Sequence, residues 1–123
     1  MYEKAGLSSL ERLVGKSVSS ICFLPNYIQI VFEDLILTCY TNPVVCISEE
    51  RVDSLMPGFK DKLCMLIGKS VQSVVEKLRD ELAVYFDDGG SITISLRFED
   101  AVSVEAAMLQ NQSGTIFDVW RYE

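Results

Sequence analysis

The chain has no histidine, the side chain used most often for acid–base catalysis and for binding transition metals. Its four cysteines include no Cys-x-x-Cys pair, so a zinc site would need an irregular set of cysteines or carboxylates. A serine or cysteine nucleophile would need a lysine or carboxylate base, and no such arrangement is recognisable. We therefore predict that the protein is not an enzyme and has no metal or other cofactor.

Long apolar runs are also absent. No stretch approaches the roughly 18 residues that a membrane-spanning helix needs. The first residues, Met1-Tyr2-Glu3-Lys4, lack the basic region and apolar stretch of a signal peptide. The sequence therefore predicts one domain over residues 1–123, in the cytoplasm and without membrane contact.

The cysteines have apolar neighbours in the sequence, which predicts buried, reduced thiols.

Positive charge is scarce, with 11 basic against 18 acidic residues and a net charge of −7. There is no basic stripe, so a nucleic-acid partner is not expected. A basic protein would be attracted, and its association would be accelerated. Acidity that serves only solubility is the simpler explanation of the charge taken alone.

The chain contains one internal repeat. Leu13-Val14-Gly15-Lys16-Ser17-Val18-Ser19-Ser20 returns as Leu66-Ile67-Gly68-Lys69-Ser70-Val71-Gln72-Ser73. Two copies are too few for a solenoid, so the repeat indicates a duplicated half-domain. We place the copies at residues 7–47 and 57–100, followed by a C-terminal helix and strand in residues 101–123.

Each copy is predicted to be a helix followed by three strands. Apolar residues at helical spacing precede Gly15 and Gly68, which should end the two helices. The expected strands span residues 18–24, 27–32, 35–40, 71–75, 82–86 and 92–96. Further expectations are a short edge strand at 44–47, a linker at 48–51, a helix at 103–109 and a strand at 115–122. The predicted fold class is α+β: two helix–three-strand repeats forming a mostly antiparallel sheet, with a short C-terminal helix and a closing strand.

Gly-Lys-Ser is reminiscent of a phosphate-binding loop, but its context is wrong. A P-loop has a glycine five residues before the Gly-Lys pair, where this chain has Leu10 and Leu63. A P-loop also follows a strand and opens a helix, whereas this motif closes a helix and opens a strand. We therefore interpret Gly15 and Gly68 as helix C-caps, with Lys16 and Lys69 near the negative helix ends.

Resemblance to a known family rests on several segments that together span most of the chain. They are the two Leu-Val/Ile-Gly-Lys-x-Val motifs, residues 26–32, Thr41-Asn42-Pro43, residues 57–64, residues 95–100 and Glu105-Ala106-Ala107. With these segments the chain resembles small bacterial proteins similar to the immunity proteins encoded beside polymorphic toxins, including those of contact-dependent inhibition systems. That family offers no catalytic motif to transfer.

The resemblance implies an immunity protein that binds and neutralises a cognate toxin, with a basic nuclease domain as the expected partner. The toxin's active site or substrate surface would be blocked. Paired acids in turns are ordinarily solvated tips, and terminal aromatics are equally well explained by core packing. The candidate toxin-binding residues are Glu49, Glu50, Asp53, Asp87, Asp88, Glu99, Asp100, Trp120 and Tyr122.

Two other function classes stay open. One is a non-catalytic protein-binding or self-associating module without a toxin partner, which would form a homodimer through an edge strand. The other is a small enzyme that works through Cys46 or a carboxylate-bound metal.

Overall fold

The protein is built mainly of β-strands. The structure, a computed structural model, describes residues 8–122. Within these residues, strands make up 49% and helices 12%, and the strands form two antiparallel five-stranded sheets. The predicted α+β class with helix–strand repeats is therefore wrong. The first copy's helix is only a 3-10 turn, η1 (Ser9–Leu13), and the second copy's is a short α-helix, α1 (Phe59–Cys64).

Strands occur wherever the alternating segments predicted them. Three further elements, the strands at residues 50–52 and 105–111 and the 3-10 turn at residues 98–100, were not predicted in this form. The first sheet has the order β1 (Val18–Phe23), β2 (Ile28–Phe32), β3 (Leu35–Cys39), β9 (Glu105–Asn111) and β10 (Ile116–Arg121). The second has the order β5 (Glu50–Val52), β4 (Val44–Ile47), β8 (Ser91–Ser95), β7 (Glu81–Phe86) and β6 (Val71–Lys77). A second 3-10 turn, η2 (Phe98–Asp100), follows β8.

The helix predicted at residues 103–109 is a strand. Glu105–Asn111 forms β9, which pairs with β3 on one side and with β10 on the other. Ala106, Ala107 and Leu109 are fully buried there. Pairing with two neighbouring strands and burial in the core outweigh the helix propensity of this alanine-containing segment.

The two copies of the repeat complete each other's sheets. Strands β1–β3 and β6–β8 are equivalent, and each first strand carries a bulge at the same place, between Val18 and Ser20 and between Val71 and Ser73. The β4–β5 hairpin of the first half then adds to β8, in the second sheet. The β9–β10 hairpin of the second half adds to β3, in the first sheet. The hairpins are thus equivalent and exchanged, so each half of the chain contributes to both sheets.

The repeated Gly-Lys-Ser segments lie against each other where the two sheets join. Ser17 and Ser70 form an antiparallel bridge, with their Oγ atoms 2.9 Å apart. Four backbone hydrogen bonds flank the bridge in two equivalent pairs: Gly15 N–H to Val71 O (2.9 Å) with Gly68 N–H to Val18 O (2.8 Å), and Val18 N–H to Lys69 O (3.0 Å) with Val71 N–H to Lys16 O (2.9 Å). The motif is therefore a structural joint between the halves.

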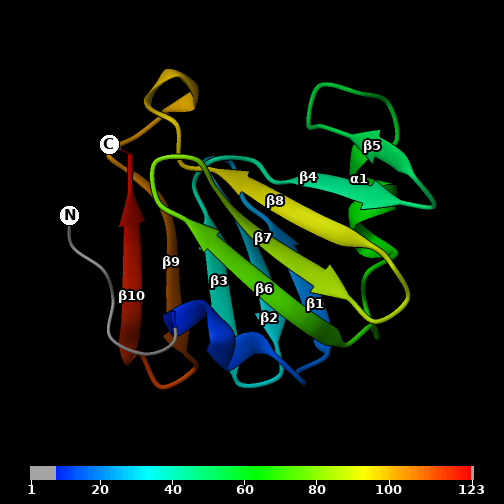
Figure 1. Ribbon diagram of the computed structural model, residues 1–123, viewed down its shortest axis with the longest axis horizontal. Helices are drawn as coiled ribbons and strands as arrows, with labels where there is room; N and C mark the ends of the chain where they lie inside the picture. The colour runs from blue at the N-terminus through cyan, green and yellow to red at the C-terminus, as the bar shows by residue number, and fades with distance from the viewer. Residues whose placement is uncertain (1–7, 123) are drawn as a thin grey trace.

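One hydrophobic core fills the space between the sheets. The second sheet runs obliquely in front of the first, with η1 beside β10 and β6 at the lower left (Figure 1). On that side Leu10 and Leu13 of η1 are fully buried, and the Arg12 guanidinium lies 3.9 Å from the centre of the Phe117 ring. At the right, α1 lies beside β4 and β5 and buries Phe59 and Leu63. No helix within residues 8–122 is long and apolar enough to cross a membrane.

Candidate functional site

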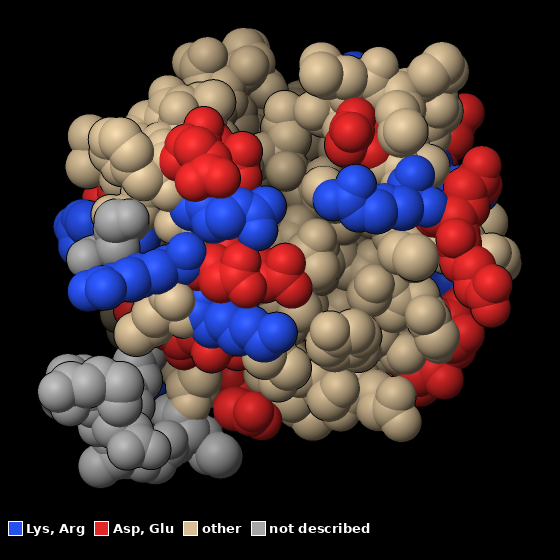
Figure 2. Space-filling view, turned by 45° about the horizontal axis from the view of Figure 1, so that its top comes forward, with Lys and Arg blue, Asp and Glu red and all other residues tan. Residues whose placement is uncertain are grey.

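Two acidic turns meet at one end of the second sheet. Ser48 and Glu49, both with positive φ (53° and 66°), form the tight turn between β4 and β5. Residues 87–90 form the turn between β7 and β8, and strand pairing of Cys46 with Ser91 brings the two turns side by side. We call Glu49, Glu50, Asp87 and Asp88 the acidic end. Figure 2 shows acidic side chains along the right edge of the molecule, the side on which both turns lie in Figure 1.

Half of the acidic end is already paired with lysine. Glu50 lies 2.6 Å from Lys62 Nζ, and Asp88 forms an ion pair with Lys69. The hydrogen bond from Lys69, together with the Gly90 N–H, holds the pKa of Asp88 below its usual value. Glu49 and Asp87 are exposed and have no ion-pair partner among the described residues. These two carboxylates are therefore available to a partner's basic groups.

An uncharged sheet face adjoins the acidic end. Strand pairing places Ser73, Tyr85, Ser91 and Cys46 in one row across β6, β7, β8 and β4. Tyr85 is 40% exposed, because its neighbours Val84 and Phe86 point into the core. We call this row the Tyr85 face. In Figure 2 a broad region without charged side chains borders the acidic right edge.

The sequence-based candidate list omitted Tyr85. Its signal was present in the alternation of Leu82, Val84 and Phe86, which are buried and leave Tyr85 on the outer face of β7. A solvent-exposed tyrosine next to an Asp-Asp turn matches the composition of protein-binding surfaces.

The remaining acidic candidates lie at the opposite end of the second sheet. Asp53 follows β5, and its carboxylate accepts a hydrogen bond from Leu55 N–H at 2.9 Å. Glu99 and Asp100 belong to η2, beyond the far end of β8. Asp100 accepts a 2.6 Å hydrogen bond from Ser95 Oγ and pairs with Arg97 at 3.3 Å. The structure therefore brings four of the seven acidic candidates together and leaves three elsewhere. The linker predicted at residues 48–51 is not found: Ser48 and Glu49 form the β4–β5 turn, and residues 50–51 belong to β5.

The two aromatic candidates are mainly structural. Trp120 is only 3% exposed, and its indole N–H donates a 3.0 Å hydrogen bond to Glu76, which also accepts from Ser8 Oγ. Tyr122 is half-buried and shares a hydrogen bond with Thr41, and burial raises the pKa of its hydroxyl. Trp120 cannot contact a partner without disrupting the core, so we omit it from the candidate surface.

Exposed apolar side chains gather in the segment that joins the two sheets after β8. Phe98, Val102 and Val104 are 73%, 74% and 77% exposed. Apolar side chains this exposed are typical of contact surfaces when they cluster. This apolar segment begins beyond the C-terminal end of β8, whereas the acidic end precedes its N-terminal end.

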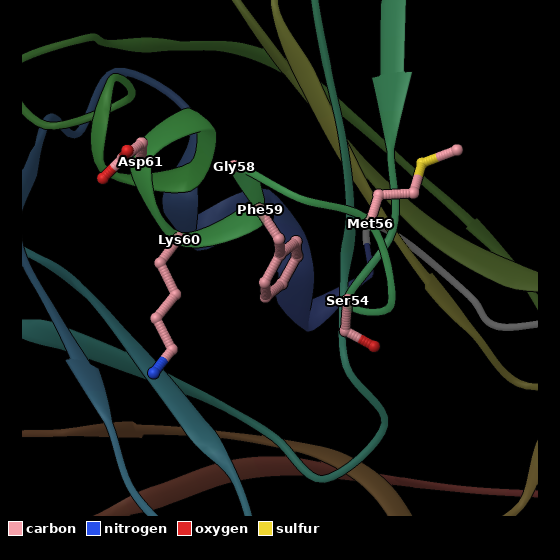
Figure 3. Close-up of a pocket in the computed structure, with 6 residues that line it drawn as sticks. All are labelled: Ser54, Met56, Gly58, Phe59, Lys60 and Asp61. Atoms are coloured by element: carbon pink, nitrogen blue, oxygen red, sulfur yellow. The ribbon is translucent and has the colours of Figure 1, made fainter.

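A shallow hollow of about 300 Å³ lies beside α1 and the loop that precedes it. Its lining residues are Ser54, Met56, Gly58, Phe59, Lys60 and Asp61. In Figure 3 the Phe59 ring points into the hollow between Ser54 and Lys60, whereas Met56 and Asp61 point away from it. Lys60 and Asp61 diverge, so the hollow does not assemble an acid–base pair.

The four cysteines are free thiols in different environments. Cys39 is fully buried, and desolvation raises the pKa of its thiol to about 12. Cys22 and Cys64 are exposed and Cys46 is half-buried, so the prediction of buried thiols is correct only for Cys39. Cys46 lies across from Ser91 and Arg51, neither of which is a general base. Within residues 8–122, no three His, Cys, Asp or Glu side chains are grouped as metal ligands would be.

Comparison with protein-family models, curated proteins and solved structures gives no match.

Proposed function

We propose that this chain is an immunity protein that binds a cognate bacterial toxin in the cytoplasm and blocks the toxin's active site or substrate surface. The observation that supports the proposal best is the position of the acidic end beside the Tyr85 face. Exposed carboxylates next to an exposed tyrosine suit a basic protein surface, such as the substrate surface of a nuclease. The resemblance of the sequence to immunity proteins supports the same function.

The proposed contact would use carboxylates that have no ion pair to break within the described residues. Since Glu49 and Asp87 have no ion-pair partner among the described residues, a basic residue of the toxin can approach them without breaking an existing pair. Tyr85 would supply the apolar contact with little loss of side-chain freedom. The net charge of −7 would accelerate the encounter with a basic toxin, and inhibition depends on capture before the toxin acts.

The test is coexpression of the chain with the C-terminal domain of a large secreted protein encoded beside its gene. We expect the chain to restore growth and to form a 1:1 complex on a sizing column. The E49K/D87K variant should lose both effects at physiological salt. The single E99K variant reverses an exposed acid of η2, away from the acidic end, and should protect like the original chain.

Three results would count against the proposal. If E49K/D87K protects as well as the original chain, the proposed electrostatic contact through Glu49 and Asp87 is wrong. If E99K is the only variant that loses protection, the toxin contacts η2 and not the acidic end. Failure of the chain to bind any toxin encoded beside it would reject the immunity function itself.

A second candidate is a self-associating module without a toxin, favoured by the exposed apolar segment. In that case Phe98, Val102 and Val104 would be buried between two copies. Sedimentation over a hundredfold range of concentration would then show a dimer that V102D/V104D abolishes. A chain that stays monomeric throughout would remove this candidate.

A further inference from the structure

Each half of the chain is the binding partner of the other half. Residues 8–52 supply β1–β3 to the first sheet and β4–β5 to the second. Residues 59–122 supply β6–β8 to the second sheet and β9–β10 to the first. Without the other half, the backbone groups of β3 or β8 on one side would have no strand to pair with.

The surfaces between the halves are continuous. Strand β3 pairs with β9 along its whole length, from Leu35 with Asn111 to Cys39 with Ala107. Strand β4 pairs with β8 from Val44 with Thr93 to Cys46 with Ser91. The Ser17–Ser70 bridge and the shared core add a third and a fourth region of contact.

Only the loop of residues 53–58 connects the halves covalently. It is exposed at Leu55 (93%) and Met56 (46%). Its internal hydrogen bonds include those from Leu55 N–H to Asp53 Oδ1 and from Met56 N–H to Asp53 O. A different path of this loop would therefore change little of the contact between the halves.

We propose that two copies of this chain exchange halves, so that residues 8–52 of one copy assemble with residues 59–122 of the other. All contacts outside the loop are the same in the monomer and in the exchanged dimer. The balance is then set by the loop and by concentration. A short flexible connection gives an effective concentration of about 1 mM, so the monomer should prevail well below that value and the dimer above it.

A disulfide across the joint distinguishes the two states. Ser17 and Ser70 lie opposite each other, so cysteines at both positions would be close enough to form one. S17C/S70C would be made with Cys22, Cys46 and Cys64 replaced by serine. Glutathione disulfide is the oxidant: it accepts two electrons and two protons from the two thiols and leaves as two glutathione thiols.

The expected result depends on the concentration of refolding. At about 10 µM the disulfide should form within one chain, and above about 1 mM part of the protein should become a covalent dimer on a non-reducing gel. S17C and S70C singly are the controls and should give no such dimer. The proposal would be overturned if the disulfide forms within one chain at both concentrations. It would also be overturned if light scattering shows a dimer whose two chains are not joined by the disulfide.

The loop length gives an independent variant. Deletion of Leu55–Pro57 should prevent the halves of one chain from meeting and make the protein dimeric at about 10 µM. Insertion of six Gly/Ser residues at the same place should leave it monomeric. A shortened chain that stays folded and monomeric would also overturn the proposal. If the shortened chain does not fold, the disulfide experiment decides alone.

Discussion

Ser17 and Ser70 occupy equivalent positions in the two halves and face each other, Oγ to Oγ, at 2.9 Å. The serine of Gly-Lys-Ser therefore pairs with its own copy, and the flanking amides hydrogen-bond across the joint. In a P-loop, such amides would be directed at phosphate. A motif associated with nucleotide binding is thus used here to hold a duplication together.

The joint depends on two glycines in the left-handed region. Gly15 and Gly68 have φ values of +87° and +93°. G15A and G68A should each lower the free energy of unfolding by about 1–3 kcal/mol, because a side chain strains this conformation. Urea unfolding followed by circular dichroism measures the loss. G90A is the control, because Gly90 lacks a positive φ and a Cβ there would make ordinary contacts of 3.4–3.5 Å. The stability of the G90A variant should stay close to that of the original chain.

Two lysine–aspartate pairs, Lys16–Asp34 and Lys69–Asp88, occupy equivalent places and should make the fold acid-sensitive. The lysine hydrogen bond is the largest cause that lowers the pKa of Asp34 and Asp88 from the usual 3.8. A carboxyl with a lowered pKa in the folded state stabilises above its unfolded pKa and loses that contribution as the pH falls through the folded value.

D34N/D88N should therefore be less stable than the original chain at pH 6, with the difference disappearing toward pH 2. Urea midpoints at pH 6, 4 and 2.5 measure this. E49Q is the control, because Glu49 has no ion-pair partner in the described part of the chain. A difference that grows at low pH would contradict this explanation.

The thiols should react in an order set by burial. Cys22 and Cys64 are exposed, whereas Cys39 is buried and has a thiol pKa of about 12. At pH 8 a disulfide reagent should modify Cys22 and Cys64 first, and Cys39 only after unfolding, because the thiolate is the reactive form. Mass spectrometry of peptides after timed labelling identifies the sites. Rapid labelling of Cys39 in the folded chain would show that the first sheet opens locally.

Tyr85 should matter for binding and little for folding. The residue is 40% exposed, so Y85S should keep most of the stability of the fold. If the Tyr85 face contacts the toxin, the affinity should fall at least about tenfold, as expected of a buried aromatic anchor. Titration calorimetry with the purified toxin domain measures the affinity. V75S changes a neighbouring exposed side chain of similar exposure (38%) and serves as the control.

The local periodicity predicted most strands because each has a buried face. Ile28, Ile30 and Phe32 alternate with half-buried residues in β2, and the same pattern holds in β8. The order of the strands was not predictable in this way, because β4 and β9 pair with strands of the other half. The local sequence of residues 44–47 and 105–111 does not indicate which sheet these strands join. The prediction of a helix at 103–109 was wrong for the same reason, because β9 is stabilised as a strand by pairing with β3 and β10.

The candidate site was predictable in part. Turn chemistry placed Asp87 and Asp88 at a tip, as found, because Gly89 and Gly90 follow them. Their proximity to Glu49 depends on pairing between β4 and β8, which is a tertiary relationship. For Trp120 the sequence left a contact surface and core packing equally open. The structure shows core packing, because Trp120 is 3% exposed and β10 is held against η1 and β6 through Phe117 and Glu76.

The exchanged hairpins also govern when the protein can fold during its synthesis. The first sheet begins with β1 at Val18 and is not complete until β10 ends at Arg121. A nascent chain must therefore keep β3 unpaired on one side until β9 has left the ribosome. A premature stop after β8 would release a chain with an open sheet edge, a target for proteases and for aggregation.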